Sequence, residues 1–231
     1  MTYRLSGMHA VLQRLGFVYK KCRHIPSKAD EAKQRAFVTE YQKLKEQKQP
    51  EDKVLFVDGC HPQHNSLLAY GWIPKGKEHL IPANTGRKRL NINGALDVET
   101  MEVLTRSDET LNADSTIVFF KDIEQHFPLA PIIYLILDNA RYYRARKVSE
   151  FLQGSRIRLL FLPPYSPNLN LIERFWKFFK KNVLYNKYYE SFAEFQQVVA
   201  QFFATLSSRN SELQTLITEN FHIIKTQSVP P

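Results

Sequence analysis

The sequence has few cysteines and no long apolar stretch. Its 231 residues include two cysteines, Cys22 and Cys60, which excludes a disulfide-stabilised secreted scaffold. The longest apolar runs, at 132–137 and 159–162, are far shorter than the roughly 20 residues of a membrane-spanning helix. The N-terminus shows no basic segment followed by an apolar run, and no internal repeat is present. We therefore expect a cytoplasmic protein that does not associate with a membrane.

Hydrophobic residues and positive charge are abundant. The hydrophobic fraction of 43% is typical of a folded protein, and the length suits one large domain or one domain with a small appendage. The net charge is +9, and the first 50 residues hold eleven basic and only four acidic residues. A basic segment on a nearly neutral body favours binding to a polyanion such as nucleic acid. A solvated, lysine-rich helix would have the same composition, so charge leaves both interpretations open.

Two helices are expected before the main body of the chain. Residues 6–15 predict a short helix that Ser6 caps and Gly16 ends. Residues 27–48 predict a second helix, with Ser27 and Asp30 in the spacing of a capping box. The apolar stripe of this second helix is thin, so we expect it to connect two parts of the protein.

The body of the chain predicts an α/β fold. Apolar runs at 54–58, 131–139 and 157–163 indicate buried strands, and 89–98 with 101–106 indicates a hairpin. Short strands are possible at 67–73 and 78–83. Helical patterns occupy 114–127, 141–153, 168–184, 190–206 and 210–219. Strand, hairpin, then strand–helix–strand implies a mixed sheet with helices on its faces.

Three acidic residues stand where such a sheet places a site. Asp58 and Asp138 each follow an apolar strand, and Glu173 enters the next strong helix. Neighbouring strands lie roughly 4.8 Å apart, so the two aspartates converge if their strands pair. Two carboxylates about 4 Å apart repel by about 4 kcal/mol at an effective dielectric near 20, so a cation is needed to hold them together. Carboxylate oxygens suit Mg²⁺ or Mn²⁺, and two such ions support phosphoryl transfer.

Each acid also has a structural interpretation. An aspartate after a strand commonly forms a turn or caps a helix. Glu173 has capping-box spacing from Asn170 and ion-pair spacing from Lys177. Beyond Glu173 the polar helix face carries Lys177, Lys180 and Lys181, opposite Ile172, Phe175, Trp176, Phe179 and Val183. That face suits a metal beside a phosphate backbone, and it suits solvent equally.

Several further residues attract attention. Arg141 and Arg144 follow Asp138 closely and can contact phosphate or face solvent. Cys60, His61 and His64 match no zinc spacing, and the histidines can line the site, touch DNA or pack. Trp72 and Trp176 are expected in the core.

Three segments carry a family resemblance. SPNLNLIERFW (166–176) after FLPPY, LILDNARYYRA (135–145) and VLFVDG (54–59) resemble the three acid motifs of the mariner-like DDE transposases, especially their bacterial insertion-sequence relatives. The 34 residues between Asp138 and Glu173 match that branch, and the resemblance covers roughly residues 1–220. Asp58-Gly59 and Pro167-Asn168 depart from the Asp-Glu and Pro-Asp pairs of many eukaryotic relatives, but no acid of the triad is replaced.

The resemblance implies a fold, a chemistry and partners. It implies a ribonuclease-H-like fold, with Asp58, Asp138 and Glu173 as catalytic and metal-binding residues for Mg²⁺ or Mn²⁺, two ions in all. The activity implied is DNA cleavage and strand transfer at transposon ends, by a homodimer on DNA. A catalytically idle or domesticated DNA-binding remnant and a stand-alone ribonuclease-H-like nuclease are the alternatives.

The same resemblance divides the chain. Residues 1–26 resemble the end of a helix-turn-helix unit, 27–50 a linker helix and 51–225 the ribonuclease-H-like catalytic domain. The family usually carries two helix-turn-helix units. We expect residues 1–24 to recognise transposon ends poorly without a partner helix, which an upstream reading frame could supply.

Overall fold

A five-stranded mixed sheet forms the centre of the protein. The computed structural model describes residues 5–19, 26, 28–84 and 88–225. The strands are β1 (Lys53–Cys60), β2 (Asn91–Asp97), β3 (Val103–Asp108), β4 (Ile133–Leu137) and β5 (Ile157–Phe161), in the order β3-β2-β1-β4-β5. β1, β2 and β3 pair antiparallel, whereas β4 is parallel to both β1 and β5. The predicted mixed sheet and its hairpin are thus confirmed.

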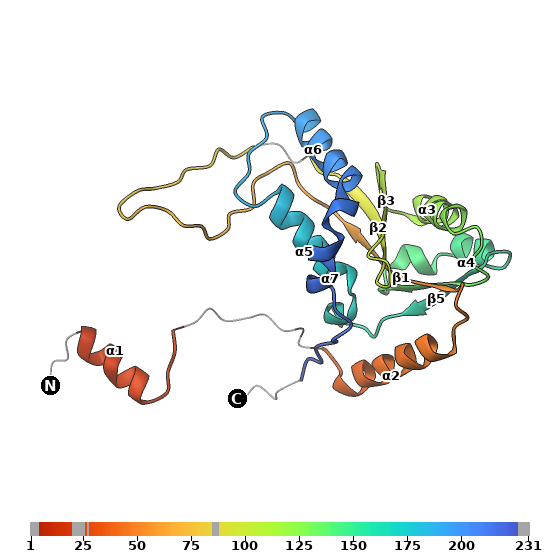
Figure 1. The fold of residues 1–231 in the computed structure, drawn as a ribbon, viewed down its shortest axis with the longest axis horizontal. Helices are drawn as coiled ribbons and strands as arrows, with labels where there is room; N and C mark the ends of the chain where they lie inside the picture. The colour runs from red at the N-terminus through yellow and green to blue at the C-terminus, as the bar shows by residue number, and fades with distance from the viewer. Residues whose placement is uncertain (1–4, 20–25, 27, 85–87, 226–231) are drawn as a thin grey trace.

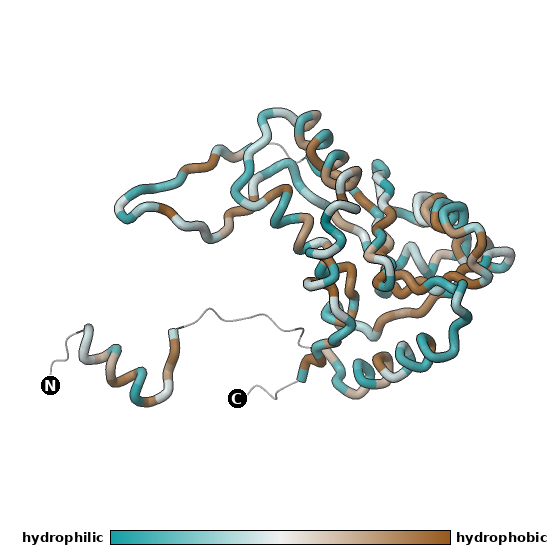
Figure 2. Tube along the Cα trace, in the orientation of Figure 1, coloured by the Kyte–Doolittle hydropathy of each residue, from teal (hydrophilic) through white to brown (hydrophobic). Residues whose placement is uncertain are grey.

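Helices cover both faces of this sheet (Figure 1). They are α3 (Ala113–His126), α4 (Arg146–Leu152), α5 (Ile172–Val183), α6 (Phe192–Ala204) and α7 (Asn210–Leu216). Leu55 and Val57 of β1 pack with α3 and α4, while Val54 and Phe56 pack with α5, α6 and α7. Side chains alternate between faces along a strand, so a strand with apolar residues at every position is buried on both sides. Figure 2 shows the apolar sheet between more hydrophilic helices.

Two helices differ from the sequence prediction: one is divided into two parts, and the other begins later than expected. The pattern at 141–153 splits into a 3-10 turn, η1 (Arg141–Arg144), and α4. The helix expected from 168 begins at Ile172, after a 3-10 turn, η2 (Pro167–Leu169). Proline fixes its own backbone and restricts the residue before it, which favours the tight turn before the helix.

The segment between β1 and β2 contains no named strand in its described part. The strands expected at 67–73 and 78–83 are wrong, because this segment forms only isolated bridges, Gln63 to Arg89 and Leu67 to Tyr185. It extends away from the sheet in Figure 1, and its Trp72 is fully exposed. The expectation that Trp72 lies in the core is therefore wrong, whereas Trp176 is buried at 1% exposure. Apolar side chains cannot form a strand where no neighbouring strand is present to pair with.

Among the described residues, two helices precede the sheet. α1 (Leu5–Arg14) lies apart from the sheet in Figure 1, and Gly16 in the turn that follows it has a φ of 80°. Ser6 lies inside this helix rather than before it. α2 (Glu31–Gln47) begins after Asp30, whose side chain accepts a hydrogen bond from the Lys33 N–H. Asp30 is therefore the cap of α2, and Ser27 of the expected capping box lies outside the described residues.

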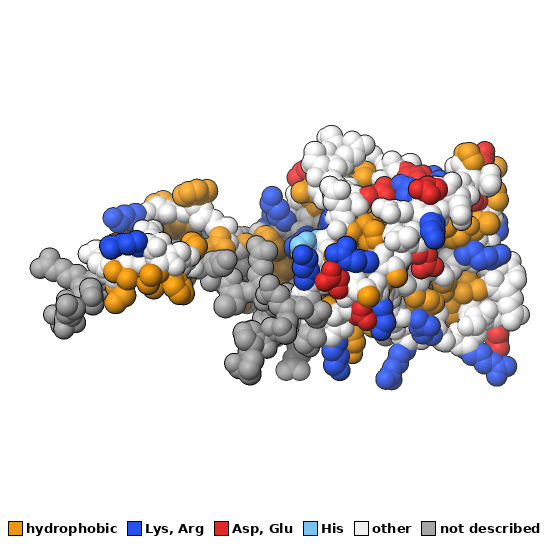
Figure 3. Space-filling model, turned by 90° about the horizontal axis from the view of Figure 1, so that it is seen from below, with side chains coloured by type: hydrophobic (Ala, Val, Ile, Leu, Met, Phe, Trp, Pro, Cys, Tyr) orange, Lys and Arg blue, Asp and Glu red, His pale blue; other side chains and the backbone are white. Residues whose placement is uncertain are grey.

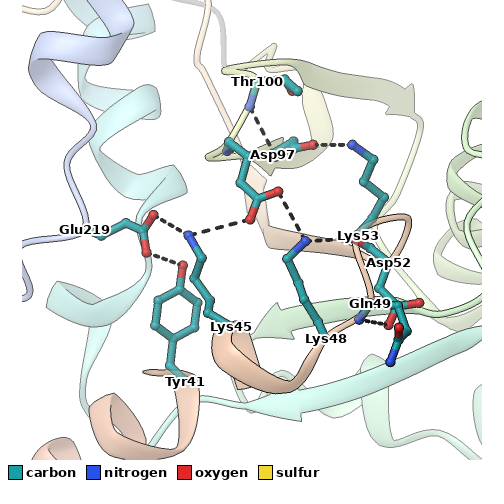
Figure 4. Close-up of polar contacts among 10 residues, drawn as sticks. Tyr41, Lys45, Lys48, Gln49, Asp52, Lys53, Asp97, Thr100 and Glu219 are labelled. Carbon is teal, nitrogen blue, oxygen red and sulfur yellow. Dashed lines mark hydrogen bonds and ion pairs between the residues drawn. The ribbon is translucent and has the colours of Figure 1, made fainter. Parts of the chain in front are cut away.

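α2 is fastened to the body along its length. Phe37 and Tyr41 are buried in the same core as α5. The Tyr41 hydroxyl donates to Glu219, and Lys45 pairs with Glu219 at 2.7 Å and Glu99 at 3.6 Å (Figure 4). α2 thus belongs to the packed body. No helix among the described residues is long and apolar enough to cross a membrane.

Candidate active site

Asp58 and Asp138 lie side by side at the carboxyl ends of two paired strands. β1 and β4 run parallel with Phe56 opposite Ile136, and two residues further along each strand stand Asp58 and Asp138. Asp58 lies inside β1, two residues before its end, rather than after it. Like Phe56 and Ile136, the two aspartates occupy positions that face α5. The convergence predicted from the sequence is confirmed for this pair.

A glycine lets α5 approach the sheet beside these aspartates. Gly94 of β2 stands opposite Asp58. A Cβ atom at Gly94 would lie 2.5 Å from the Trp176 ring and 3.1 Å from Ile172 Cδ1. Because position 94 has no side chain, α5 can lie close against the sheet, and Glu173 at its start comes to the same edge as Asp58.

The three acids line one hollow of about 480 Å³. Asn139, Ala140 and Asn170 line it too, together with the segment Leu162–Pro167. Asn139 Nδ2 donates to the Leu162 carbonyl at 2.7 Å, which fixes this segment to the end of β4. The hollow is polar where the acids converge and apolar along the proline-rich segment.

Burial and neighbouring charges raise the pKa values of Asp58 and Glu173. Burial, the nearby Glu173 carboxylate and then that of Asp138 raise the pKa of Asp58 to about 7, although the Gly59 N–H and Lys180 act in the opposite direction. Glu173 has an exposed side chain, yet exclusion of water from around its carboxylate raises its pKa, with Lys180 opposing and Asp138 adding to the shift. Like charges and desolvation both disfavour the ionised form, so the site stores an electrostatic cost that a bound cation would relieve.

Asp138 also forms a turn, which was the structural interpretation of an aspartate that follows a strand. Its Oδ1 accepts the Ala140 N–H at 2.9 Å, at the start of the turn into η1. This bond occupies one carboxylate oxygen and orients the other. The described residues contain no group of three or more Asp, Glu, His or Cys side chains gathered closely enough to hold one ion among them. The arrangement instead suits two pairs of carboxylates that have Asp58 in common, since the charges of both Asp138 and Glu173 act on Asp58.

The capping interpretation of Glu173 is wrong. The residue before α5 is Leu171, and no side chain caps the helix. A capping box would need the Asn170 N–H to meet the Glu173 carboxylate, but that N–H donates to the Pro167 carbonyl. The Asn170 side chain donates instead to the Val57 carbonyl at 3.1 Å. Glu173 is therefore free for another role, and Lys177 affects its pKa less than Lys180 does.

Asn170 and Tyr142 are site residues that the sequence did not reveal. Asn170 is 4% exposed and lines the hollow. The Tyr142 hydroxyl lies 3.6 Å from the position a Cβ of Gly59 would take, and burial followed by Asp138 and Asp58 raises its pKa. In the sequence, Asn170 has the spacing of a helix cap and Tyr142 lies in a segment with a helical pattern. Neither pattern indicates a site, so only the tertiary neighbours identify these residues as part of it.

The five basic residues considered for DNA contact surround the acids unequally. Lys180 acts on both Asp58 and Glu173, and Lys177 acts on Glu173, whereas Lys181 is exposed further along α5. Arg144 donates to Asn139 Oδ1 at 2.6 Å and stacks on Phe161 at 3.8 Å. Arg141 is exposed beside it. On the face seen in Figure 3, basic side chains are spread among acidic ones rather than gathered in one patch.

The histidines differ in role. His64 is buried, its Nε2 lies 2.9 Å from the Tyr189 carbonyl, and its ring stacks on Phe195, so it has a packing role. His61 is exposed with Nδ1 2.8 Å from Asn91 Oδ1. Cys60 is buried, and Cys22 lies outside the described residues.

Two protein-family models match the chain. A model described as DDE superfamily endonuclease matches residues 53–196, a range that includes Asp58, Asp138 and Glu173. The chain belongs to the DDE superfamily of endonucleases. A second model, winged helix-turn helix, matches residues 1–41, which reaches from α1 into α2. The resemblance drawn from the three acid motifs is thereby confirmed.

The chain is also similar to one curated protein and to solved transposase structures. An insertion element IS630 uncharacterized 39 kDa protein of Shigella sonnei is 23% identical over 158 residues, and the chain spans 46% of its length. The solved Mos1 transposase paired-end complex with left transposon end has a TM-score of 0.64 at 15% identity, covering 94% of this chain and 71% of that one. The mariner Mos1 paired end complex with Mg has a TM-score of 0.65 at 15% identity, covering 95% and 72%. The ribonuclease-H-like fold expected from the sequence is confirmed.

Proposed function

We propose that this chain is the catalytic part of a DNA transposase, a metal-dependent endonuclease and strand transferase that acts on transposon ends. The observation that carries the proposal is the convergence of Asp58, Asp138 and Glu173 on one hollow, where the pKa of Asp58 rises to about 7. Such crowding costs stability and serves no packing purpose, so it favours a site that receives positive charge. Family membership supports the same chemistry.

The donor set fits Mg²⁺ or Mn²⁺. Carboxylate oxygens are hard ligands, and the hollow is large enough to admit a phosphate group beside them. Asp58 and Asp138 would hold one ion, and Asp58 and Glu173 a second. Bound ions would activate the attacking water or hydroxyl and stabilise the leaving oxygen. The chain's own residues hold the acids in place: the Asp138 turn, the Gly94 contact and the Asn139 bond fix the three elements.

DNA is the proposed partner. Lys177, Lys180 and Lys181 follow Glu173 on α5, and Arg141 and Arg144 follow Asp138 beyond β4, so these basic side chains suit phosphate contacts near the acids. The solved Mos1 complexes named above are paired-end complexes, which supports a homodimer on DNA as the working form. The match of residues 1–41 to a winged helix-turn helix supports end recognition by the N-terminal segment.

The test is product analysis on DNA that carries the terminal inverted repeats flanking the gene. With Mg²⁺, the protein should cut at the repeat ends and join the freed 3′-hydroxyl to target DNA. Cutting without joined products would favour a stand-alone nuclease. Binding without cutting, with all three acids intact, would favour an idle DNA-binding remnant. Scrambled DNA of equal length is the control for end recognition.

A further inference from the structure

Asn170 joins two of the acid-bearing elements. Its Nδ2 donates to the carbonyl of Val57, the residue before Asp58, at 3.1 Å. Its own carbonyl accepts the Glu173 N–H at 3.2 Å. One residue therefore ties the part of β1 next to Asp58 to the first turn of α5, which carries Glu173.

The other side-chain atom of Asn170 has no partner. Asn170 is 4% exposed, and its Oδ1 is buried without a hydrogen bond to any described residue. The residue lines the hollow that the three acids share. A buried acceptor left unpaired costs roughly 1–3 kcal/mol, so its persistence beside a polar hollow points to a partner that enters the hollow.

The orientation of the amide follows from its neighbours. Exchanging Oδ1 and Nδ2 would set an acceptor against the Val57 carbonyl, which is itself an acceptor and can receive only a donor. Nδ2 must therefore face Val57, and Oδ1 is the atom left unpaired. An ionised carboxylate cannot satisfy Oδ1, because it is also an acceptor. The missing partner must be a donor.

We propose that Asn170 is a positioning residue of the acid site, whose Nδ2 sets the spacing of Asp58 and Glu173 and whose Oδ1 accepts a hydrogen bond from a water on the divalent cation. A cation-bound water is a strong donor, which matches what Oδ1 lacks. This inference rests on the proposed function, since it needs a divalent cation at the acids. Outer-shell partners of this kind typically contribute about 10–100-fold to metal affinity.

Asn168 supplies a matched control. It is the same residue type on the same segment, two positions earlier, and it also has an unpaired Oδ1. Its Nδ2 faces away from the acids, towards Gln34 Oε1 at 2.9 Å and the His222 carbonyl at 2.7 Å. Asn168 does not line the hollow. Replacing it loosens the segment without removing the Asn170 amide from the lining of the hollow.

The experiment is calorimetric titration of the full chain with Mn²⁺ in the absence of DNA. Asn170→Ala should weaken Mn²⁺ binding by about 10-fold or more, as expected for an outer-shell partner. Asn168→Ala should bind Mn²⁺ like the wild type while melting at a lower temperature. If Asn170→Ala does not fold, Asn170→Leu fills the same volume without polar atoms and should show the same loss.

The outcomes separate this inference from the function on which it rests. Wild-type affinity in the Asn170 variants overturns the inference alone, and so does an equal loss in Asn168→Ala, which would show a loosened segment. Absence of saturable Mn²⁺ binding in the wild type, or binding that survives Asp58→Asn, overturns the proposed function and the inference with it.

Discussion

At the scale of single residues, Asp58 is an acid placed where ionisation is unfavourable. It is half-buried in β1 beside Glu173 and Asp138, and its pKa rises from 3.8 to about 7. Between these two values the folded chain keeps a proton that the unfolded chain has released. Asp58 therefore favours folding at acid pH, and this contribution is lost as the pH rises through about 7.

Asp58→Asn should therefore gain stability relative to the wild type as the pH rises. In the presence of EDTA, the Tm of the variant minus that of the wild type should increase between about pH 4 and pH 7 and then level off. Because each kcal/mol shifts the Tm of a chain of this size by roughly 2–4 °C, the gap should reach several degrees. Thermal melts at five pH values measure it, and a gap that does not change with pH contradicts the pKa assigned to Asp58.

At the scale of elements, α5 is the part that completes the site. It carries Glu173 and Lys180, and its position depends on the contact of Trp176 with Gly94. The hydrophobic pattern of α5 predicted its buried face correctly, because apolar residues at helical spacing have one way to reach a core. The tight contact with β2 could not be predicted, since no local pattern marks which strand residue a helix will meet.

Gly94→Ala should disturb both stability and the site. A Cβ 2.5 Å from the buried Trp176 ring must displace α5. Overpacking of this kind typically costs about 1–3 kcal/mol, and cleavage should fall further than stability because Glu173 moves with the helix. Gly154→Ala is the matched control, since nothing lies within 4 Å of its Cβ position. Wild-type melting and cleavage in Gly94→Ala would show that the contact does not position α5.

The lysines of α5 should contribute to DNA binding in proportion to their phosphate contacts. Replacing Lys177, Lys180 and Lys181 by Ala should lower the slope of log affinity against log salt by about one unit per lost contact. Lys180→Ala should reduce cleavage most, because Lys180 acts on both Asp58 and Glu173. Lys121→Ala on α3, across the sheet, serves as the control. An unchanged salt slope in the triple variant would assign this face to solvent.

Local patterns failed where long-range partners decide the structure. The apolar residues of 67–73 predicted a strand, but no strand lies beside them and Trp72 is exposed. Asn170 had the spacing of a helix cap, yet its side chain bonds Val57, which is distant in the sequence. Asp58 and Asp138 were predictable because parallel pairing of β1 and β4 follows from buried strands and brings their ends together.

At the scale of the whole molecule, α2 packs against the body that carries the three acids. The sequence suggested a linker helix ending near residue 50, with the catalytic domain beginning at 51. In the structure, Phe37 and Tyr41 are buried against the core, and Lys45 and Lys48 pair with Glu99 (Figure 4). Gln34, which is fully buried, also receives the Asn168 amide of the segment leading to α5. α2 therefore contacts the segment that leads to α5 and the acid site.

A chain that starts at residue 51 should consequently be less stable than one that starts at residue 28. Loss of α2 exposes the apolar surface that Phe37 and Tyr41 cover, and removal of a buried Phe side chain alone typically costs about 3–5 kcal/mol. Melting of the two chains, 28–225 and 51–225, measures the difference. Equal Tm values would show that α2 is a linker and contributes nothing to the fold.

The central claim is that Asp58, Asp138 and Glu173 act together through a divalent cation on DNA. Its most direct test is cleavage of inverted-repeat DNA by the wild type and by Asp58→Ala, Asp138→Ala and Glu173→Ala, each across a Mg²⁺ titration. The account predicts Mg²⁺-dependent cutting by the wild type and none by any variant at any Mg²⁺ concentration, with each variant still folded by circular dichroism. Cutting by the wild type in EDTA, or near-normal cutting by a variant, would contradict it.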